Sequence, residues 1–92
     1  MRTKYQMQVR QARVNNANAL LTWLEKNWGL SGKKVMEEII DPFFEDTGLE
    51  RFEVWRAWGI LKKTGRCTDR SGWKWELLSK EPVMMLEDGS VK

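Results

Sequence analysis

The apolar period changes from helical to alternating in the last third of the chain, and this change constrains the fold most. Apolar residues recur at helical spacing as far as Leu61, and Gly65 then supplies a stop. A polar turn follows at 69–72, and beyond it apolar and charged residues alternate, as in a half-buried strand. The sequence therefore predicts a helix followed by a β-hairpin with strands at 66–68 and 73–77.

The helix before the hairpin is expected to begin near Gly48 and to run to about Lys63. Thr47 and Glu50 have the spacing of a capping box, in which both side chains satisfy free amides of the first turn. Lys62 lies in the last turn, where a cation suits the helix dipole. The apolar residues of this helix share one face and are expected in the core: Val54, Trp58 and Leu61.

Two further helices are expected upstream. The first covers about 15–28, with Asn15 or Asn16 as its cap and Gly29 as its end. Its apolar stripe contains Ala17, Leu20, Leu21, Leu24 and Trp28.

The second helix is shorter and starts after the cap residue Ser31. The pair Asp41-Pro42 interrupts it, because proline disfavours helix in the residue before it. Phe43 and Phe44 then either add one helical turn that fills the core or lie in a connection.

The two ends of the chain lie outside the expected domain, which covers 15–80. The segment 1–14 is ambiguous in period and forms either a flexible basic arm or an added element that mediates dimerisation. The segment 81–92 forms either a tail or a short added strand.

The composition excludes several classes of function. A chain of 92 residues provides one domain. With Cys67 as the single cysteine and no histidine, we expect no disulfide, no metal site, no cofactor and no Ser-His or Cys-His nucleophile. No apolar run is long enough to cross a membrane, so no membrane partner is expected. These points indicate a cytoplasmic protein in a reducing compartment that is not an enzyme.

The distribution of charge indicates nucleic acid more than the net charge of +3 does. The segment 1–14 holds four basic residues and no acidic one, and 48–80 holds eight basic against four acidic residues. The acidic residues concentrated in 37–46 have the pattern of a solvated face. Two separate basic segments favour a nucleic-acid partner over an ordinary solvated surface.

The order helix, short helix, helix and hairpin resembles the winged helix-turn-helix family of DNA-binding domains. The resemblance covers about 16–79, and the run from the third helix into the hairpin carries it. In that family the run reads Val-x-x-x-Leu-x-x-Leu-x-x-x-Gly, followed by a strand, a turn and an aromatic-x-Leu strand. The matching positions here are Val54, Trp58, Leu61 and Gly65, then 66–68, then Trp75 and Leu77. The fold class implied is α+β, mainly α, with three helices and a hairpin wing.

The resemblance implies that the outward side of the third helix enters the major groove. Arg56 is then the first candidate for a base contact, and Arg51 is the second. Lys62 and Lys63 would contact phosphates, which position the protein without specifying sequence. The alternative is that these charges only solubilise a surface helix.

The hairpin is implied to lie along the DNA backbone or the minor groove. Its candidate contacts are Arg70 at the tip, Lys74 on the following strand and Arg66 before the hairpin. Arg2 and Lys4 are candidate contacts from a flexible arm.

Phe52 and Trp55 do not fit a groove-facing helix. If Phe43 and Phe44 fold back over them they are core, which is the interpretation we favour from the sequence. If they are exposed, they form a patch that marks a partner surface, and the chain is then a protein-interaction module, an adaptor or an inhibitor.

The sequence thus favours a small DNA-binding protein that regulates transcription or replication by occupancy. Double-stranded DNA is the expected partner, and a homodimer is expected on a two-fold site.

Overall fold

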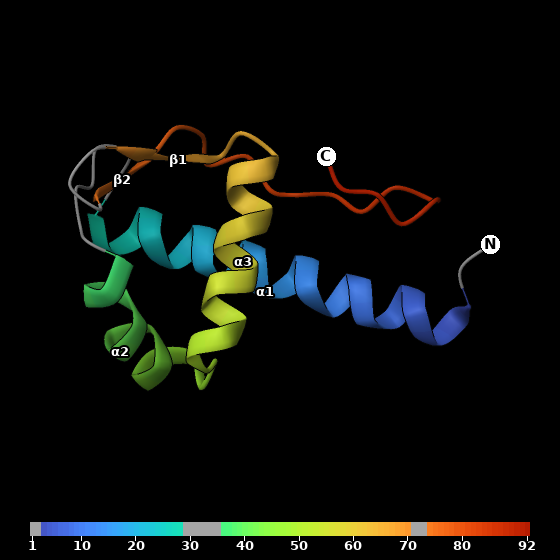
Figure 1. The fold of residues 1–92 in the computed structure, drawn as a ribbon, viewed down its shortest axis with the longest axis horizontal. Coiled ribbons are helices and arrows are strands. Elements are labelled where there is room, and N and C mark those ends of the chain that lie inside the picture. Colours follow the sequence, from blue (N-terminus) through green and yellow to red (C-terminus); the bar gives the residue numbers. More distant parts are fainter. Residues whose placement is uncertain (1–2, 29–35, 71–73) are drawn as a thin grey trace.

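The computed structural model describes residues 3–28, 36–70 and 74–92 (Figure 1). Within these ranges the chain forms three helices followed by a two-stranded antiparallel hairpin, so the expected α+β class, mainly helical, is confirmed. The elements are α1 (Lys4–Trp28), α2 (Met36–Thr47), α3 (Arg51–Lys63), β1 (Cys67–Arg70) and β2 (Lys74–Leu77).

Helix α1 begins eleven residues before the expected cap at Asn15, so that expectation is wrong. Thr3 and Gln6 form the capping interaction instead: the Gln6 amide donates to Thr3 Oγ1 at 3.1 Å, and the Thr3 amide donates to Gln6 Oε1 at 2.9 Å. Asn15 lies inside the helix, where its Oδ1 accepts from Gln11 Nε2 at 2.9 Å. The described part of 1–14 is therefore the N-terminal half of α1 and not a flexible arm.

Helix α2 continues through Pro42, so the expected interruption at Asp41-Pro42 is also wrong. Proline cannot donate to the carbonyl four residues earlier, at Glu38. The burial of Ile39 and Phe43 on the inner face of the same helix outweighs that loss. The expected cap Ser31 lies outside the described residues.

The segment between α2 and α3 differs from the expected capping box. Thr47 ends α2, where its Oγ1 donates to the Phe43 carbonyl at 2.7 Å. Gly48 follows with a φ of 77°, a left-handed conformation that glycine adopts without strain. Glu50 is the N-cap of α3, and its capping box is formed with Glu53.

The expected end of α3 at Gly65 is confirmed. Gly65 has a φ of 76°, its amide donates to the Lys62 carbonyl at 3.1 Å, and the Arg66 amide donates to the Leu61 carbonyl at 2.9 Å. This is a Schellman motif, which uses carbonyls that the helix leaves free. The inner face of α3 packs across α1, and the expected core residues of α3 are buried with Ala57: Val54, Trp58 and Leu61.

The hairpin pairs Cys67 with Leu77 and Arg70 with Lys74, so β1 extends two residues beyond the expected strand. The C-terminal segment then lies along the N-terminal half of α1 (Figure 1). Asn18 anchors it, because its Nδ2 donates to the Val83 carbonyl at 3.0 Å and its Oδ1 accepts from the Val83 amide at 2.7 Å. Residues 84–92 fold back on themselves through a bridge between Met85 and Val91.

Candidate nucleic-acid interface

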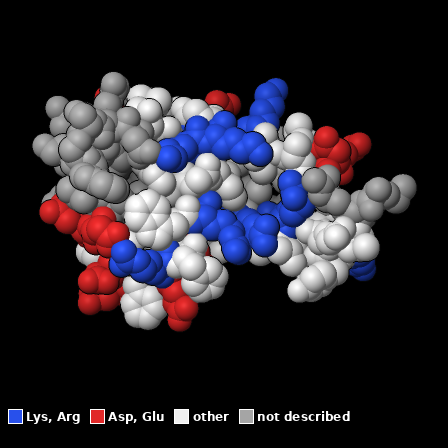
Figure 2. All heavy atoms as spheres, viewed as in Figure 1, with Lys and Arg blue, Asp and Glu red and all other residues white. Residues whose placement is uncertain are grey.

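The outward side of α3 combines basic and apolar side chains. Phe52, Arg56 and Lys63 lie on this side, because Arg56 and Lys63 follow Phe52 at i+4 and i+11 of the helix. All three residues are exposed. The one acidic residue of α3, Glu53, lies apart from them in the first turn and caps the helix. The outward side of α3 is therefore electropositive. Figure 2 shows Lys and Arg gathered over α3 and the adjoining part of α1, and Asp and Glu gathered over α2.

Arg56 is held in place by an aromatic neighbour on its own helix. Its Cζ atom lies 5.8 Å from the centroid of the Phe52 ring, which is within the range of a cation–π interaction. The Phe52 side chain remains 56% exposed. Phe52 thus orients the guanidinium of the first candidate base contact, which the sequence did not suggest.

Arg51 points away from Arg56, toward α2. Its Nη2 lies 2.6 Å from Oε1 and 2.7 Å from Oε2 of Glu37. Both side chains are more than half exposed, so the pair contributes at most about 1 kcal/mol to stability. The carboxylate nevertheless offsets the charge of Arg51, which makes Arg51 a weaker candidate for a base contact than Arg56.

A hollow between α1 and α3 brings four cations together. We call it the α1–α3 pocket; it has a volume of about 170 Å³, and Val14, Ile60 and Val91 form its apolar wall. A second hollow of about 240 Å³, lined by Gln6, Val9, Arg10 and Arg13, adjoins it along α1. Within the described ranges, no Asp or Glu lines either hollow. The four cations are Arg10, Arg13, Arg56 and Lys63.

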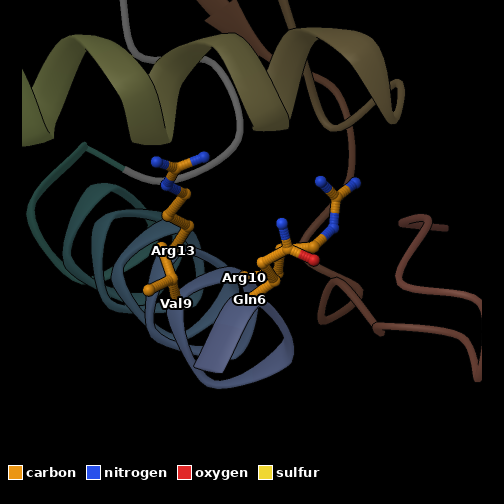
Figure 3. Close-up of a pocket in the computed structure, with 4 residues that line it drawn as sticks. All are labelled: Gln6, Val9, Arg10 and Arg13. Carbon is orange, nitrogen blue, oxygen red and sulfur yellow. The ribbon is translucent and has the colours of Figure 1, made fainter. Parts of the chain in front are cut away.

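The two arginines of α1 reach the pocket in different ways. Arg10 Nε donates to the Gly89 carbonyl at 2.7 Å, which ties it to the C-terminal segment. Arg13 extends from α1 toward α3 (Figure 3), and its buried Nε has no acceptor among the residues that the structure describes. The sequence indicated both only as part of a basic segment. The signal that could have placed them is their spacing from Gln6 at i+4 and i+7, on one face of a helix.

Arg66 is not a surface residue, so its expected role as a backbone contact is wrong. Its side chain is only 8% exposed, and its guanidinium donates to three backbone carbonyls. The acceptors are the carbonyls of Thr64 at 3.0 Å from Nη1, Glu81 at 2.9 Å from Nε and Pro82 at 2.8 Å from Nη2. Arg66 therefore fastens the C-terminal segment to the end of α3.

The remaining candidate contacts are placed only in part. Lys62 is exposed in the last turn of α3, and Lys4 is exposed at the first position of α1. Arg70 and Lys74 pair in register at the end of the hairpin where β1 leads into β2, and their side chains lie outside what the structure describes. Arg2 also lies outside the described residues.

Phe52 and Trp55 are both exposed, so the expectation that they belong to the core is wrong. Trp55 is 40% exposed, and Phe44, which was expected to cover them together with Phe43, is itself exposed. Phe43 alone turns inward, because consecutive residues of a helix lie about 100° apart. The outcome is an exposed aromatic pair, Phe52 and Trp55, one helical turn apart on α3.

Gly59 lies in the middle of the outward side of α3 without a structural requirement for glycine. A Cβ atom at this position would meet nothing within 4 Å among the described residues, and the residue is not in the left-handed region. Glycine inside a helix costs about 0.5–1 kcal/mol relative to alanine. Glycine at position 59 therefore lowers the stability of α3 and leaves the backbone of the helix accessible to a binding partner.

The variant Gly59→Ala is expected to raise the free energy of unfolding by about 0.5–1 kcal/mol, because alanine removes that cost. Urea denaturation followed by tryptophan fluorescence measures the change. Gly65→Ala is the matched control and should lower stability, since Gly65 has a φ of 76°. A loss of stability in Gly59→Ala would instead indicate that Gly59 has a role in packing.

None of the helices that the structure describes is long and apolar enough to cross a membrane. Within the same residues, no group of three His, Cys, Asp or Glu side chains is placed to hold a metal ion. Comparison with protein-family models, curated proteins and solved structures gives no match.

Proposed function

We propose that the chain binds double-stranded DNA as a small winged-helix regulator of transcription or replication, acting by occupancy in the cytoplasm. The observation that carries this proposal is the outward side of α3, which presents Arg56 and Lys63, on a helix that packs against β1 of the hairpin. A helix of this kind fits the major groove, where arginine binds the O6/N7 edge of guanine with two hydrogen bonds. Gly59 supports the proposal, because a helix without a side chain at its midpoint approaches DNA more closely.

In this proposal the parts of the surface have separate roles. Arg56 reads a base edge, while Lys62 and Lys63 hold phosphates. The hairpin follows the backbone with Arg70 and Lys74. One domain of this size covers a short site, so a homodimer on a two-fold DNA site is expected.

Fluorescence anisotropy of a labelled random-sequence duplex, titrated at several salt concentrations, tests the proposal. The logarithm of the affinity is expected to fall linearly with the logarithm of the salt concentration, since each phosphate contact releases counterions. The double variant Arg56→Gln/Lys63→Gln should reduce that slope by about 0.9, because Lys63 holds one phosphate and Arg56 reads a base edge. A reduction of about 1.8 would show that Arg56 neutralises a phosphate as well.

The matched control is Lys26→Gln/Lys80→Gln, which removes the same formal charge from exposed positions at the C-terminal part of α1 and beside it, where Lys80 Nζ lies 3.6 Å from Glu25 Oε1. This variant is expected to keep the slope of the unmodified protein. A folded protein that fails to bind duplex DNA at low salt would contradict the proposal, and so would equal effects of the two double variants.

The exposed aromatic pair supports a second candidate, a protein-interaction module that uses Phe52 and Trp55. Tryptophan and arginine are enriched among the residues that dominate binding energy at protein interfaces. The variant Trp55→Ala separates the candidates in the same titration. Unchanged duplex affinity would place Trp55 outside the DNA interface, as the protein-interaction module requires, and reduced affinity would place it in the DNA interface.

A further inference from the structure

We propose that the α1–α3 pocket binds a phosphate group, clamped between the arginines of α1 and the cations of α3. When the phosphate belongs to the DNA backbone, this inference rests on the proposed function and adds α1 to the interface. The sequence did not assign Arg10 or Arg13 to any contact.

The charge in the pocket is unbalanced. Arg10 and Arg13 of α1 face Arg56 and Lys63 of α3, and no acidic side chain of the described residues lines the hollow. The four side chains carry like charges, so they repel one another. A bound anion would turn the repulsion into attraction, and the apolar wall of Val14, Ile60 and Val91 would strengthen it by excluding water.

Arg13 supplies a donor that the described residues leave unused. Its Nε is buried and has no acceptor within the described part of the chain. An unsatisfied buried donor costs about 1–3 kcal/mol, so such a group calls for an explanation. The guanidinium lies between α1 and α3 (Figure 3), where a ligand oxygen in the pocket can accept from it.

Two of the four cations are fixed before any ligand arrives. The Gly89 carbonyl holds Arg10 Nε at 2.7 Å, and the Phe52 ring lies against the guanidinium of Arg56 at 5.8 Å. Ordering a long side chain on binding costs about 0.5–1.5 kcal/mol. Because these side chains are already ordered, less of the interaction energy is lost when the ligand binds.

The size and donor set of the pocket favour phosphate over carboxylate. A volume of about 170 Å³ is more than ten times the roughly 10–15 Å³ that one water requires. Three guanidiniums and one ammonium offer donors from two opposite walls. The arginine fork fits both groups, but a carboxylate presents two oxygens in one plane, whereas a phosphate presents oxygens in several directions and can accept from both walls.

NMR titration of the full chain with inorganic phosphate tests the inference. Arginine side-chain N–H signals are followed, with sodium chloride at matched ionic strength as the control titrant. We expect the Nε–H signal of Arg13 to shift and to saturate in the millimolar range with phosphate but not with chloride. Arg13→Gln should weaken this binding by about tenfold or more, as expected for the loss of charge-assisted hydrogen bonds.

The variants Arg13→Lys and Lys26→Gln distinguish phosphate binding by the guanidinium of Arg13 from a general effect of positive charge. Arg13→Lys keeps the charge but loses the fork, so it should weaken phosphate binding, whereas Lys26→Gln, on the same helix, should leave it unchanged. A thermal melt of each variant establishes that it is folded. Absence of a saturable shift at Arg13, or equal weakening by Arg13→Gln and Lys26→Gln, would overturn the inference.

The duplex titration identifies the source of the phosphate. If Arg13→Gln weakens both inorganic phosphate and duplex DNA, the clamp holds the DNA backbone. If phosphate binds at Arg13 but duplex DNA does not bind the unmodified protein, the α1–α3 pocket binds a free phosphorylated ligand and the proposed function fails. If duplex DNA binds without dependence on Arg13 and phosphate does not bind, the clamp fails and the proposed function stands.

Discussion

Replacing Arg66 with methionine is expected to lower the free energy of unfolding by about 3 kcal/mol or more. The side chain is buried, and its guanidinium satisfies the backbone carbonyls of Thr64, Glu81 and Pro82. Methionine keeps most of the aliphatic volume but leaves three carbonyls without their donor. Each unsatisfied buried group costs about 1–3 kcal/mol, partly recovered where water reaches the carbonyl.

Urea denaturation measures this loss, and amide hydrogen exchange locates it. Protection is expected to fall first at Val83 and in 84–92, because Arg66 fastens the start of the C-terminal segment. Arg56→Met makes the same chemical change at an exposed position and should alter stability by no more than about 0.5 kcal/mol. Equal stabilities of Arg66→Met and the unmodified protein would show that the carbonyls do not depend on Arg66.

The variant Phe43→Ala is expected to destabilise the protein by about 3–5 kcal/mol, the range for removing a buried phenylalanine. Phe43 is fully buried and meets the Trp23 ring edge to face, with 5.4 Å between the ring centroids. Trp23 is fixed in turn by its Nε1, which donates to Asp46 Oδ2 at 2.7 Å. The lost ring would therefore leave a cavity that its neighbours cannot easily fill.

The adjacent residue provides the control for this prediction. Phe44→Ala removes the same atoms one position later on α2, where the ring is 48% exposed, and should cost about 1 kcal/mol or less. Thermal or urea denaturation of the two variants under identical conditions gives the comparison. Similar losses in both would mean that Phe44 is buried in solution and that the assignment of inner and outer faces of α2 is incorrect.

The parts of the fold that local signals determine were predictable from the sequence. The inner face of α3, its end at Gly65 and the hairpin all follow from periodicity and from the conformational freedom of one glycine. The start of α1 and the continuation of α2 through Pro42 could not be predicted from the sequence, because tertiary contacts override local preference there. Asn18 lies inside a helix and uses its amide on the Val83 backbone, and Pro42 is tolerated because Phe43 is buried beside it.

The same distinction holds for the candidate site: residues on one helix could be predicted, and residues brought together by tertiary contacts could not. Arg56 and Lys63 were found because both lie on one helix, whose faces can be read from spacing. Arg10 and Arg13 were missed as a site, because their meeting with α3 depends on how two helices cross. Arg66 was misassigned because nothing near it in the sequence indicates that the carbonyls of 81–82 return to surround it.

The bond from Arg10 to the Gly89 carbonyl joins residues 79 positions apart. The entropy lost on closing a loop grows with its length, so such a contact depends on the other elements of the fold bringing the two segments together. The α1–α3 pocket contains both of these residues and therefore exists only in the complete domain. A ligand that binds there distinguishes the native state from every partly folded form in which the C-terminal segment is detached. The stability of the native state then rises by RT ln(1 + L/Kd), where L is the free ligand concentration, so the ligand concentration relative to Kd sets how firmly the C-terminal segment stays attached.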